Sequence, residues 1–143
     1  MEQTLSLIKP DGVERGLVGE IIRRFEGDGM RIVAMKLIRL TKERAQTFYA
    51  EHRGKPFYDK LTEFMASGPV VAMVLEGENV IQRNRAIMGA TDYREAASGS
   101  IRHDFARDGT KNIVHGSDCA ASAAREIPFL FSHLEIHCHN GEG

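Results

Sequence analysis

The segment Gly68-Pro69-Val70-Val71-Ala72-Met73-Val74-Leu75 is the clearest structural signal in the chain. Six consecutive apolar residues follow a Gly-Pro turn signal, and this pattern predicts a strand over residues 70–75. A helix is predicted on either side of that strand. One covers residues 57–66, with Leu61, Phe64 and Met65 turned inward, and the other covers residues 80–88 after a turn at 76–79.

The rest of the chain also alternates strands and helices. Strands are predicted over residues 4–8 and 31–40, and helices over 17–25, 120–131 and from the N-cap Thr41 to His52. Residues 89–109 are expected to be largely loop, with one helical turn possible over 94–97, and residues 134–137 are compatible with a final strand. Strand-helix-strand occurs twice. This order predicts an α+β, ferredoxin-like split βαβ fold, in which a four-stranded antiparallel sheet carries its helices on one face, as a single domain over residues 1–143.

Composition limits the possible partners. The chain has 143 residues, of which 42% are hydrophobic and 27% charged, as in a globular domain. A net charge of −1 gives no general attraction to nucleic acid or membrane, so any anion site must be a local cluster. The two cysteines do not resemble a disulfide framework, and the first residues do not resemble a signal peptide. We therefore expect reduced thiols, a cytoplasmic location, and neither nucleic acid nor membrane as a partner.

The heptapeptide from Asn112 to Asp118 contains the most informative histidine. Ser117 and Asp118 are residue types that cap helices, and Gly116 leaves room beside the imidazole of His115. An imidazole between a strand end and a helix start is suited to meet an anion. A purely structural histidine is the alternative, but it leaves another group of polar residues without a role: Lys9, Arg85, Thr91, Arg102 and Glu126.

Seven segments of this chain resemble those of nucleoside diphosphate kinases, in the order and near the spacing of that family. The resemblance covers approximately residues 4–131. The segments are Ser6–Gly12, Phe48–His52, Lys55–Phe57, Ser67–Val70, Met88–Thr91, Gly99–Phe105 and the histidine heptapeptide.

The resemblance implies transfer of the γ-phosphate of a nucleoside triphosphate, typically ATP, to a nucleoside or deoxynucleoside diphosphate. His115 would carry the phosphoryl group in a ping-pong mechanism, and its imidazole is largely neutral near pH 7, as a nucleophile requires. Glu126 would bind the ring nitrogen that is not phosphorylated, with support from Ser117. The catalytic set implied by the resemblance is His115, Glu126, Lys9, Ser117 and Tyr49.

The nucleotide-binding set implied by the resemblance is Lys9, His52, Phe57, Arg85, Thr91, Arg102 and Asn112. Arginine forks and a lysine suit phosphate oxygens, and an aromatic ring can stack on any base. The sequence has no P-loop and no carboxylate cluster that resembles a magnesium cage. Mg²⁺ is therefore expected to arrive with the nucleotide, within reach of Glu51 or Asp118 through water.

Some positions depart from the family pattern, and some questions stay open. Gly109 replaces an aliphatic residue beside the base, Tyr93 replaces a proline, and Pro128 interrupts the last helix. The tail contains metal-ligand types at His133, His137, Cys138 and His139, but we expect no physiological metal site there. Two other functions are considered: a non-catalytic nucleotide-binding regulatory protein, and a nucleic-acid or metal-dependent regulator. The family resemblance implies a homo-oligomer, either a tetramer or a hexamer.

Overall fold

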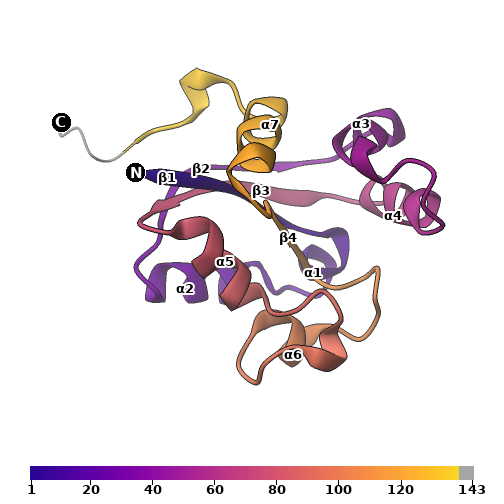
Figure 1. Cartoon of the computed structure of the whole chain (residues 1–143), viewed down its shortest axis with the longest axis horizontal. Coiled ribbons are helices and arrows are strands. Elements are labelled where there is room, and N and C mark those ends of the chain that lie inside the picture. Colours follow the sequence, from indigo (N-terminus) through magenta and orange to yellow (C-terminus); the bar gives the residue numbers. More distant parts are fainter. Residues whose placement is uncertain (139–143) are drawn as a thin grey trace.

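The computed structural model describes residues 1–138, so His139, one of the metal-ligand residue types in the tail, lies outside the described residues. A four-stranded sheet forms the centre of the molecule, in the order β2-β3-β1-β4 (Figure 1). Every neighbouring pair is antiparallel, which confirms the predicted sheet. The strands are β1 (Glu2–Ile8), β2 (Arg31–Ile38), β3 (Val70–Gly77) and β4 (Val114–Gly116).

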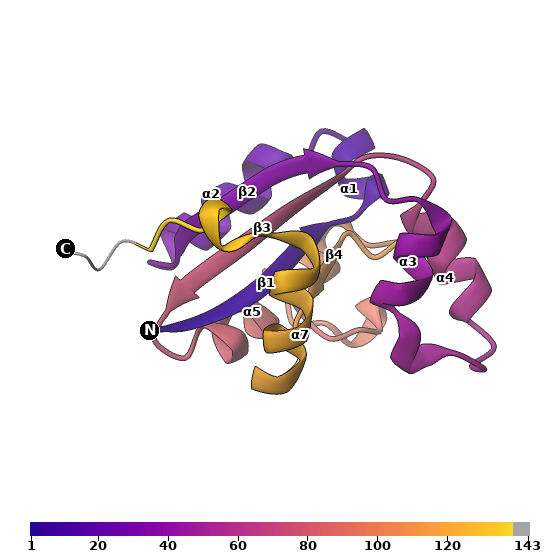
Figure 2. The same cartoon turned by 90° about the horizontal axis from the view of Figure 1, so that it is seen from above.

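Helices cover both faces of the sheet (Figure 2). The central strand β3 is buried on both sides, with Val71, Met73 and Leu75 in one core and Val70, Ala72 and Val74 in the other. As predicted, α2 (Val18–Gly27) and α5 (Val80–Met88) share one face. The expectation that all helices lie there is wrong, because α3 (Lys42–Phe48), α4 (Tyr58–Met65) and α7 (Ala120–Leu130) bury apolar side chains in the core on the opposite face.

Two short helices occupy segments that were predicted as turn or loop. Pro10 begins α1 (Pro10–Glu14), where its fixed φ and missing N–H are tolerated. The hydroxyl of Ser100 accepts a hydrogen bond from the amide of His103 and so caps α6 (Ile101–Phe105). Three 3₁₀ turns complete the description: η1 (Ala50–His52), η2 (Tyr93–Glu95) and η3 (His133–Glu135). The prediction of a possible final strand over residues 134–137 is therefore wrong. This segment makes one backbone hydrogen bond to the sheet, from the amide of His137 to the carbonyl of Val33.

The start of α7 also differs from prediction. Ser117 does not cap this helix, because its hydroxyl points to Glu126 instead. The N-cap is Cys119, and Ser122 closes the turn by accepting hydrogen bonds from the amides of Asp118 and Cys119. At the other end, Pro128 lies inside the last turn, and the helix ends at Leu130, two residues later. Within residues 1–138, no helix is both long and apolar enough to cross a bilayer.

Candidate active site

A cavity of ≈ 590 Å³ lies where β1 ends and β4 begins, and it brings most of the predicted site residues together. Lys9 follows the end of β1, His115 lies on β4, and Glu126 comes from α7. The predicted residues that line this cavity are Lys9, Tyr49, His52, Phe57, Arg85, Thr91, Arg102, Asn112, His115 and Glu126. Ser117 is the exception, because it lies fully buried behind Glu126.

The imidazole of His115 is held by one nitrogen. Its Nε2 lies 3.0 Å from Oε1 of Glu126, and Ser117 donates its hydroxyl proton to the same oxygen at 2.8 Å. A carboxylate can only accept, so this contact assigns the proton to Nε2 and leaves a lone pair on Nδ1. Phe48 and Tyr49 pack edge-on against the imidazole, with centroid distances of 5.2 and 5.6 Å. The ring is therefore fixed in orientation, with the free lone pair on Nδ1.

The carboxylate of Glu126 has a further partner that was not predicted from the sequence. Arg125 lies 3.4 Å from Oε2 of Glu126 and 2.6 Å from Oε1 of Glu51. It also donates to the carbonyl of Phe48 at 3.2 Å. Arg125 thus connects α7 to the segment beside the cavity mouth. Nothing in the sequence pattern distinguishes it from an ordinary solvated helix arginine.

Two buried cations form the inner wall of the cavity. Nζ of Lys9 donates to Oδ1 of Asn112 at 2.6 Å. Burial, with the nearby charge of Arg102, lowers the pKa of Lys9 to about 7. Burial, with the charge of Arg85, lowers the pKa of Arg102 to about 10. Arg85 itself is exposed on α5. This concentration of positive charge is a local cluster on a chain with almost no net charge, and it fits an anionic ligand.

Arg102 has a second function that was not expected. Its guanidinium donates to three backbone carbonyls, those of Asn112, Gly89 and Val114, at 3.3, 3.1 and 2.7 Å. An arginine has five N–H donors, so two remain for a ligand. Arg102 therefore fixes the loop that contains Asn112 while it presents charge to the cavity.

The phenol of Tyr49 is an unused donor in this site. Tyr49 is 4% exposed, and its hydroxyl makes no hydrogen bond with any described residue. Burial, and then the charge of Glu126, raise the pKa of Tyr49 far above its ordinary value, so the phenol keeps its proton. A buried donor without a partner beside a cavity is costly unless a ligand accepts from it.

The cavity mouth combines an aromatic ring with polar groups. Phe57 is 45% exposed, and the centroid of its ring lies 5.2 Å from that of His52. Burial, followed by the charge of Lys55, lowers the pKa of His52. Gly109 also lines the cavity, so the predicted loss of an aliphatic side chain falls at the site itself. Three further residues that line the cavity were not predicted to belong to the site: Leu61, Met88 and Thr110.

Gly116 was predicted to leave room beside His115, and the structure shows that it also lies tightly against α5. A Cβ atom at this position would lie 2.4 Å from Nδ2 of Asn84 and 2.6 Å from Sδ of Met88. A side chain would push β4 away from α5 and displace the neighbouring His115.

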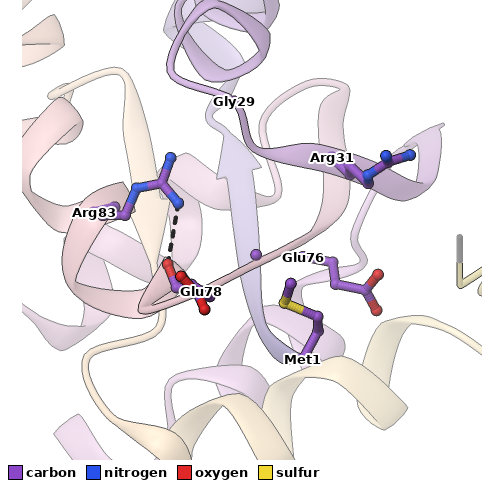
Figure 3. A pocket seen from close by; sticks show the side chains of 7 residues that line it. Met1, Gly29, Arg31, Glu76, Glu78 and Arg83 are labelled. Carbon is purple, nitrogen blue, oxygen red and sulfur yellow. Dashed lines mark hydrogen bonds between the residues drawn. The ribbon is translucent and has the colours of Figure 1, made fainter. Parts of the chain in front are cut away.

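A second cavity, of ≈ 380 Å³, lies at the opposite end of the strands (Figure 3). One of its two arginines is already paired, because Arg83 donates to the carbonyl of Glu78 and forms an ion pair with Asp28, both at 3.0 Å. The other lining residues are Met1, Gly29, Arg31, Glu76 and Gly77. Within the described part of the chain, this second cavity is lined by no histidine and by none of the predicted site residues. The first cavity is therefore the candidate active site.

Metal ligands are sparse in the part of the chain that the structure describes. No group of three or more His, Cys, Asp or Glu side chains forms a metal cluster within residues 1–138. Besides Glu126, which binds His115, two carboxylates line the cavity: Glu51 and Asp118.

Comparison with known proteins identifies the family. The sequence model described as nucleoside diphosphate kinase matches residues 2–136. A nucleoside diphosphate kinase of Desulfosudis oleivorans is 57% identical over 136 residues, covering 95% of this chain and 98% of the relative. The chain belongs to the nucleoside diphosphate kinase family.

Other nucleoside diphosphate kinases agree in sequence and in fold. The enzyme of Desulfatibacillum aliphaticivorans is 59% identical over 136 residues, 95% of this chain and 99% of that relative. The Aquifex aeolicus nucleoside diphosphate kinase structure has a TM-score of 0.92 at 51% identity, covering 94% of this chain and 98% of that one. A Halobacterium salinarum nucleoside diphosphate kinase in complex with CDP has a TM-score of 0.93 at 43% identity, covering 99% and 95%. The chain is a phosphotransferase with nucleoside diphosphate kinase activity, the transfer of a γ-phosphate from a nucleoside triphosphate to a nucleoside diphosphate.

Proposed function

We propose that His115 is the phosphoryl carrier of this reaction and that Nδ1 is the atom phosphorylated. The hydrogen bond between Nε2 and Glu126 is the observation on which this assignment rests, because it leaves the lone pair on Nδ1. Nδ1 attacks the γ-phosphorus as the bond to the bridging oxygen breaks, and the diphosphate leaves with that electron pair. A terminal oxygen of the second diphosphate then takes the phosphoryl group, and Nδ1 recovers its lone pair. The kinetics are ping-pong, since the donor's diphosphate departs before the acceptor binds.

The phosphates are held by the cations and by the free phenol. In this proposal Arg102, Arg85 and Lys9 bind the phosphate oxygens, where their charge opposes the charge that develops on the transferred group. The hydroxyl of Tyr49 donates to a phosphate oxygen. This role is supported by the absence of a hydrogen-bond partner for that hydroxyl among the described residues. The hydroxyl of exposed Thr91 does the same.

The nucleoside occupies the cavity mouth. We assign base stacking to Phe57, which is exposed beside His52. Stacking on one aromatic face tolerates any base, as an enzyme for several nucleotides requires. Asn112 and Lys9, joined at 2.6 Å, bind the sugar hydroxyls. The CDP complex of the Halobacterium relative supports a nucleoside diphosphate as the ligand.

Mg²⁺ is proposed to enter bound to the nucleotide phosphates. Two carboxylates at the cavity, Glu51 and Asp118, suit contact through water and are too few for a dedicated cage. When bound, the metal ion shields the phosphate oxygens and so assists attack by the nucleophile.

The alternative function is that of a regulatory protein that binds nucleotides without catalysing phosphoryl transfer. Incubation with γ-labelled ATP and Mg²⁺, followed by denaturation, distinguishes the two functions. We expect acid-labile, base-stable label on the wild type and none on His115→Ala, which should still bind nucleotide. Nucleotide binding without any label on the wild type would favour the regulator.

Assembly and location are also proposals. Strand β2 lies at the edge of the sheet, and its residues Met35 and Leu37 are 54% and 64% exposed. Exposed apolar residues on an edge strand support pairing with a second copy, within the tetramer or hexamer of the family pattern. Both cysteines, Cys119 and Cys138, are free and exposed, which supports a reducing, cytoplasmic location.

A further inference from the structure

The backbone at Ile113 is in an unfavourable conformation directly beside the proposed catalytic residues. Ile113 has φ +77°, in the left-handed region that a β-branched residue rarely adopts, and its side chain is fully buried. The amide of Val114 donates to the carbonyl of Asn112 at 2.9 Å, across Ile113. A bond between residues two apart with positive φ at the centre is a strained γ-turn. Such a turn persists only where the surrounding structure fixes it.

Three residues at the start of helix α1, namely Lys9, Asp11 and Gly12, fix this γ-turn. The amide of Lys9 donates to the carbonyl of Ile113 at 2.7 Å. The amide of Ile113 donates to Oδ2 of Asp11 at 3.2 Å, a contact between residues 102 positions apart. Gly12 leaves space for the side chain, because a Cβ atom there would lie 3.2 Å from Cγ2 of Ile113. The amide, the carbonyl and the side chain of Ile113 are therefore all contacted by residues 9–12.

The γ-turn sets the position of both of its chemical neighbours. Asn112 precedes it and contacts Lys9, and His115 follows two residues later on β4. Strand β4 is only three residues long, with Leu7 opposite His115 and Ile8 opposite Val114. Because a strand pairing of three residues resists displacement weakly, the γ-turn before β4 is needed to keep β4 in register with β1.

We propose that Asp11 is a positioning residue for phosphoryl transfer, whose carboxylate holds the Ile113 γ-turn and through it the imidazole of His115. Oδ1 of Asp11 is buried and has no hydrogen-bond partner among the described residues, while Oδ2 accepts from the amide of Ile113. The carboxylate also lies in the first turn of α1, where the amides of Asp11 and Gly12 favour its charged form. Lys9 offers a competing explanation, because its charge is close enough to interact with Asp11. An uncharged acceptor at position 11 separates the two explanations.

The experiment compares Asp11→Asn with Asp11→Ala. The amide oxygen of asparagine can still accept from Ile113 but carries no charge, whereas alanine removes the acceptor. We expect Asp11→Ala to lower kcat by about 100-fold, the scale of a small misplacement of reacting groups. KM should stay within about threefold, and the rate of single-turnover phosphorylation should fall with kcat. Asp11→Asn should recover most of the lost rate. Glu14→Ala, which removes an exposed carboxylate from the same helix α1, should behave as wild type.

Two results would overturn the inference. Equal losses in Asp11→Asn and Asp11→Ala would show that the charge matters rather than the acceptor. Wild-type kcat in folded Asp11→Ala, or in Asp11→Leu if the alanine variant does not fold, would show that the contact serves stability alone, because neither side chain can accept a hydrogen bond from Ile113. The inference rests on the proposed role of His115, and the same assay tests that role separately: an unlabelled wild type would refute the phosphohistidine, whereas a labelled wild type with equally fast Asp11→Ala would refute only the positioning role.

Discussion

A single hydrogen bond determines which nitrogen of His115 keeps a free lone pair, and so which one would react in the proposed mechanism. Glu126 is 4% exposed, and its Oε1 accepts from both the imidazole and Ser117. Because a carboxylate cannot donate, it imposes one tautomer and stabilises the positive charge that the ring gains on phosphorylation. The sequence could nominate His115 from its glycine-flanked context. The partnership with Glu126, eleven residues away, depended on family resemblance, since nothing in the spacing requires that contact.

Replacement of Glu126 by glutamine tests this tautomer. The amide of Glu126→Gln can donate to Nε2, which would leave the proton on Nδ1, so phosphorylation should slow by about 10²-fold or more, the scale seen when one oriented polar contact is lost. Single-turnover labelling with γ-labelled ATP measures the rate. Ser117→Ala, which removes only the supporting hydroxyl, should cost less. A Glu126→Gln rate equal to that of wild type would contradict the assignment of Nδ1.

Lys9 should change its protonation when nucleotide binds. Its pKa of about 7 leaves it mostly neutral near pH 8, and phosphates nearby favour the charged form. Binding should therefore take up a fraction of a proton, approaching about one per site. Calorimetry near pH 8 in buffers of different ionisation enthalpy measures this uptake. Lys9→Met should reduce it, and an unchanged value in that variant would assign the uptake elsewhere.

The same pKa shift predicts the sign of a stability effect. Between about pH 7 and the ordinary 10.5 of lysine, the unfolded chain binds a proton that the folded chain does not. The contribution of Lys9 to the free energy of unfolding therefore rises with pH across this window.

At the scale of elements, the site depends on how α6 and β4 are joined. Arg102 lies on α6 and donates to the carbonyls of Asn112 and Val114, on either side of the Ile113 γ-turn. Helix α6 was expected to be loop, because five residues with one capping serine carry too little periodicity to be recognised. The longer elements were predicted well, and the helix over residues 80–88 has the same bounds in the structure. The error at residues 134–137 arose because a short apolar segment near a chain end favours neither a strand nor a 3₁₀ turn.

Arg102→Lys should destabilise the fold as well as slow the reaction. A lysine cannot reproduce three fixed bonds to carbonyls, and hydrogen bonds to charged groups contribute about 1.5–3 kcal/mol each. We expect the free energy of unfolding in urea to fall by about 2 kcal/mol or more. Arg85→Lys changes an exposed arginine of the same cavity, and its stability should stay within about 0.5 kcal/mol of wild type. Equal stability of the two variants would refute the structural role of Arg102.

At the scale of the whole molecule, one sheet carries two cores and a site at one end of its strands. Alternating side chains of β3 enter opposite cores, which explains why its sequence is an unbroken apolar run. The order of strands and helices was sufficient to predict the sheet. It could not show that α3, α4 and α7 cover the second face, because strand order alone does not determine where additional helices pack. The cavity joins segments that are over 100 residues apart, such as Lys9 and Asn112, so its geometry follows from the completed sheet.

Transfer through the protein itself is the central claim, and site-resolved mass spectrometry tests it most directly. The protein would be treated with ATP and Mg²⁺ without an acceptor, kept at alkaline pH to preserve phosphohistidine, and digested. One phosphoryl group on His115, absent from His115→Ala and removed when a nucleoside diphosphate is added, is the result we predict. An unmodified imidazole under conditions where the acceptor's triphosphate accumulates would contradict the account, since the phosphoryl group would then pass between nucleotides directly.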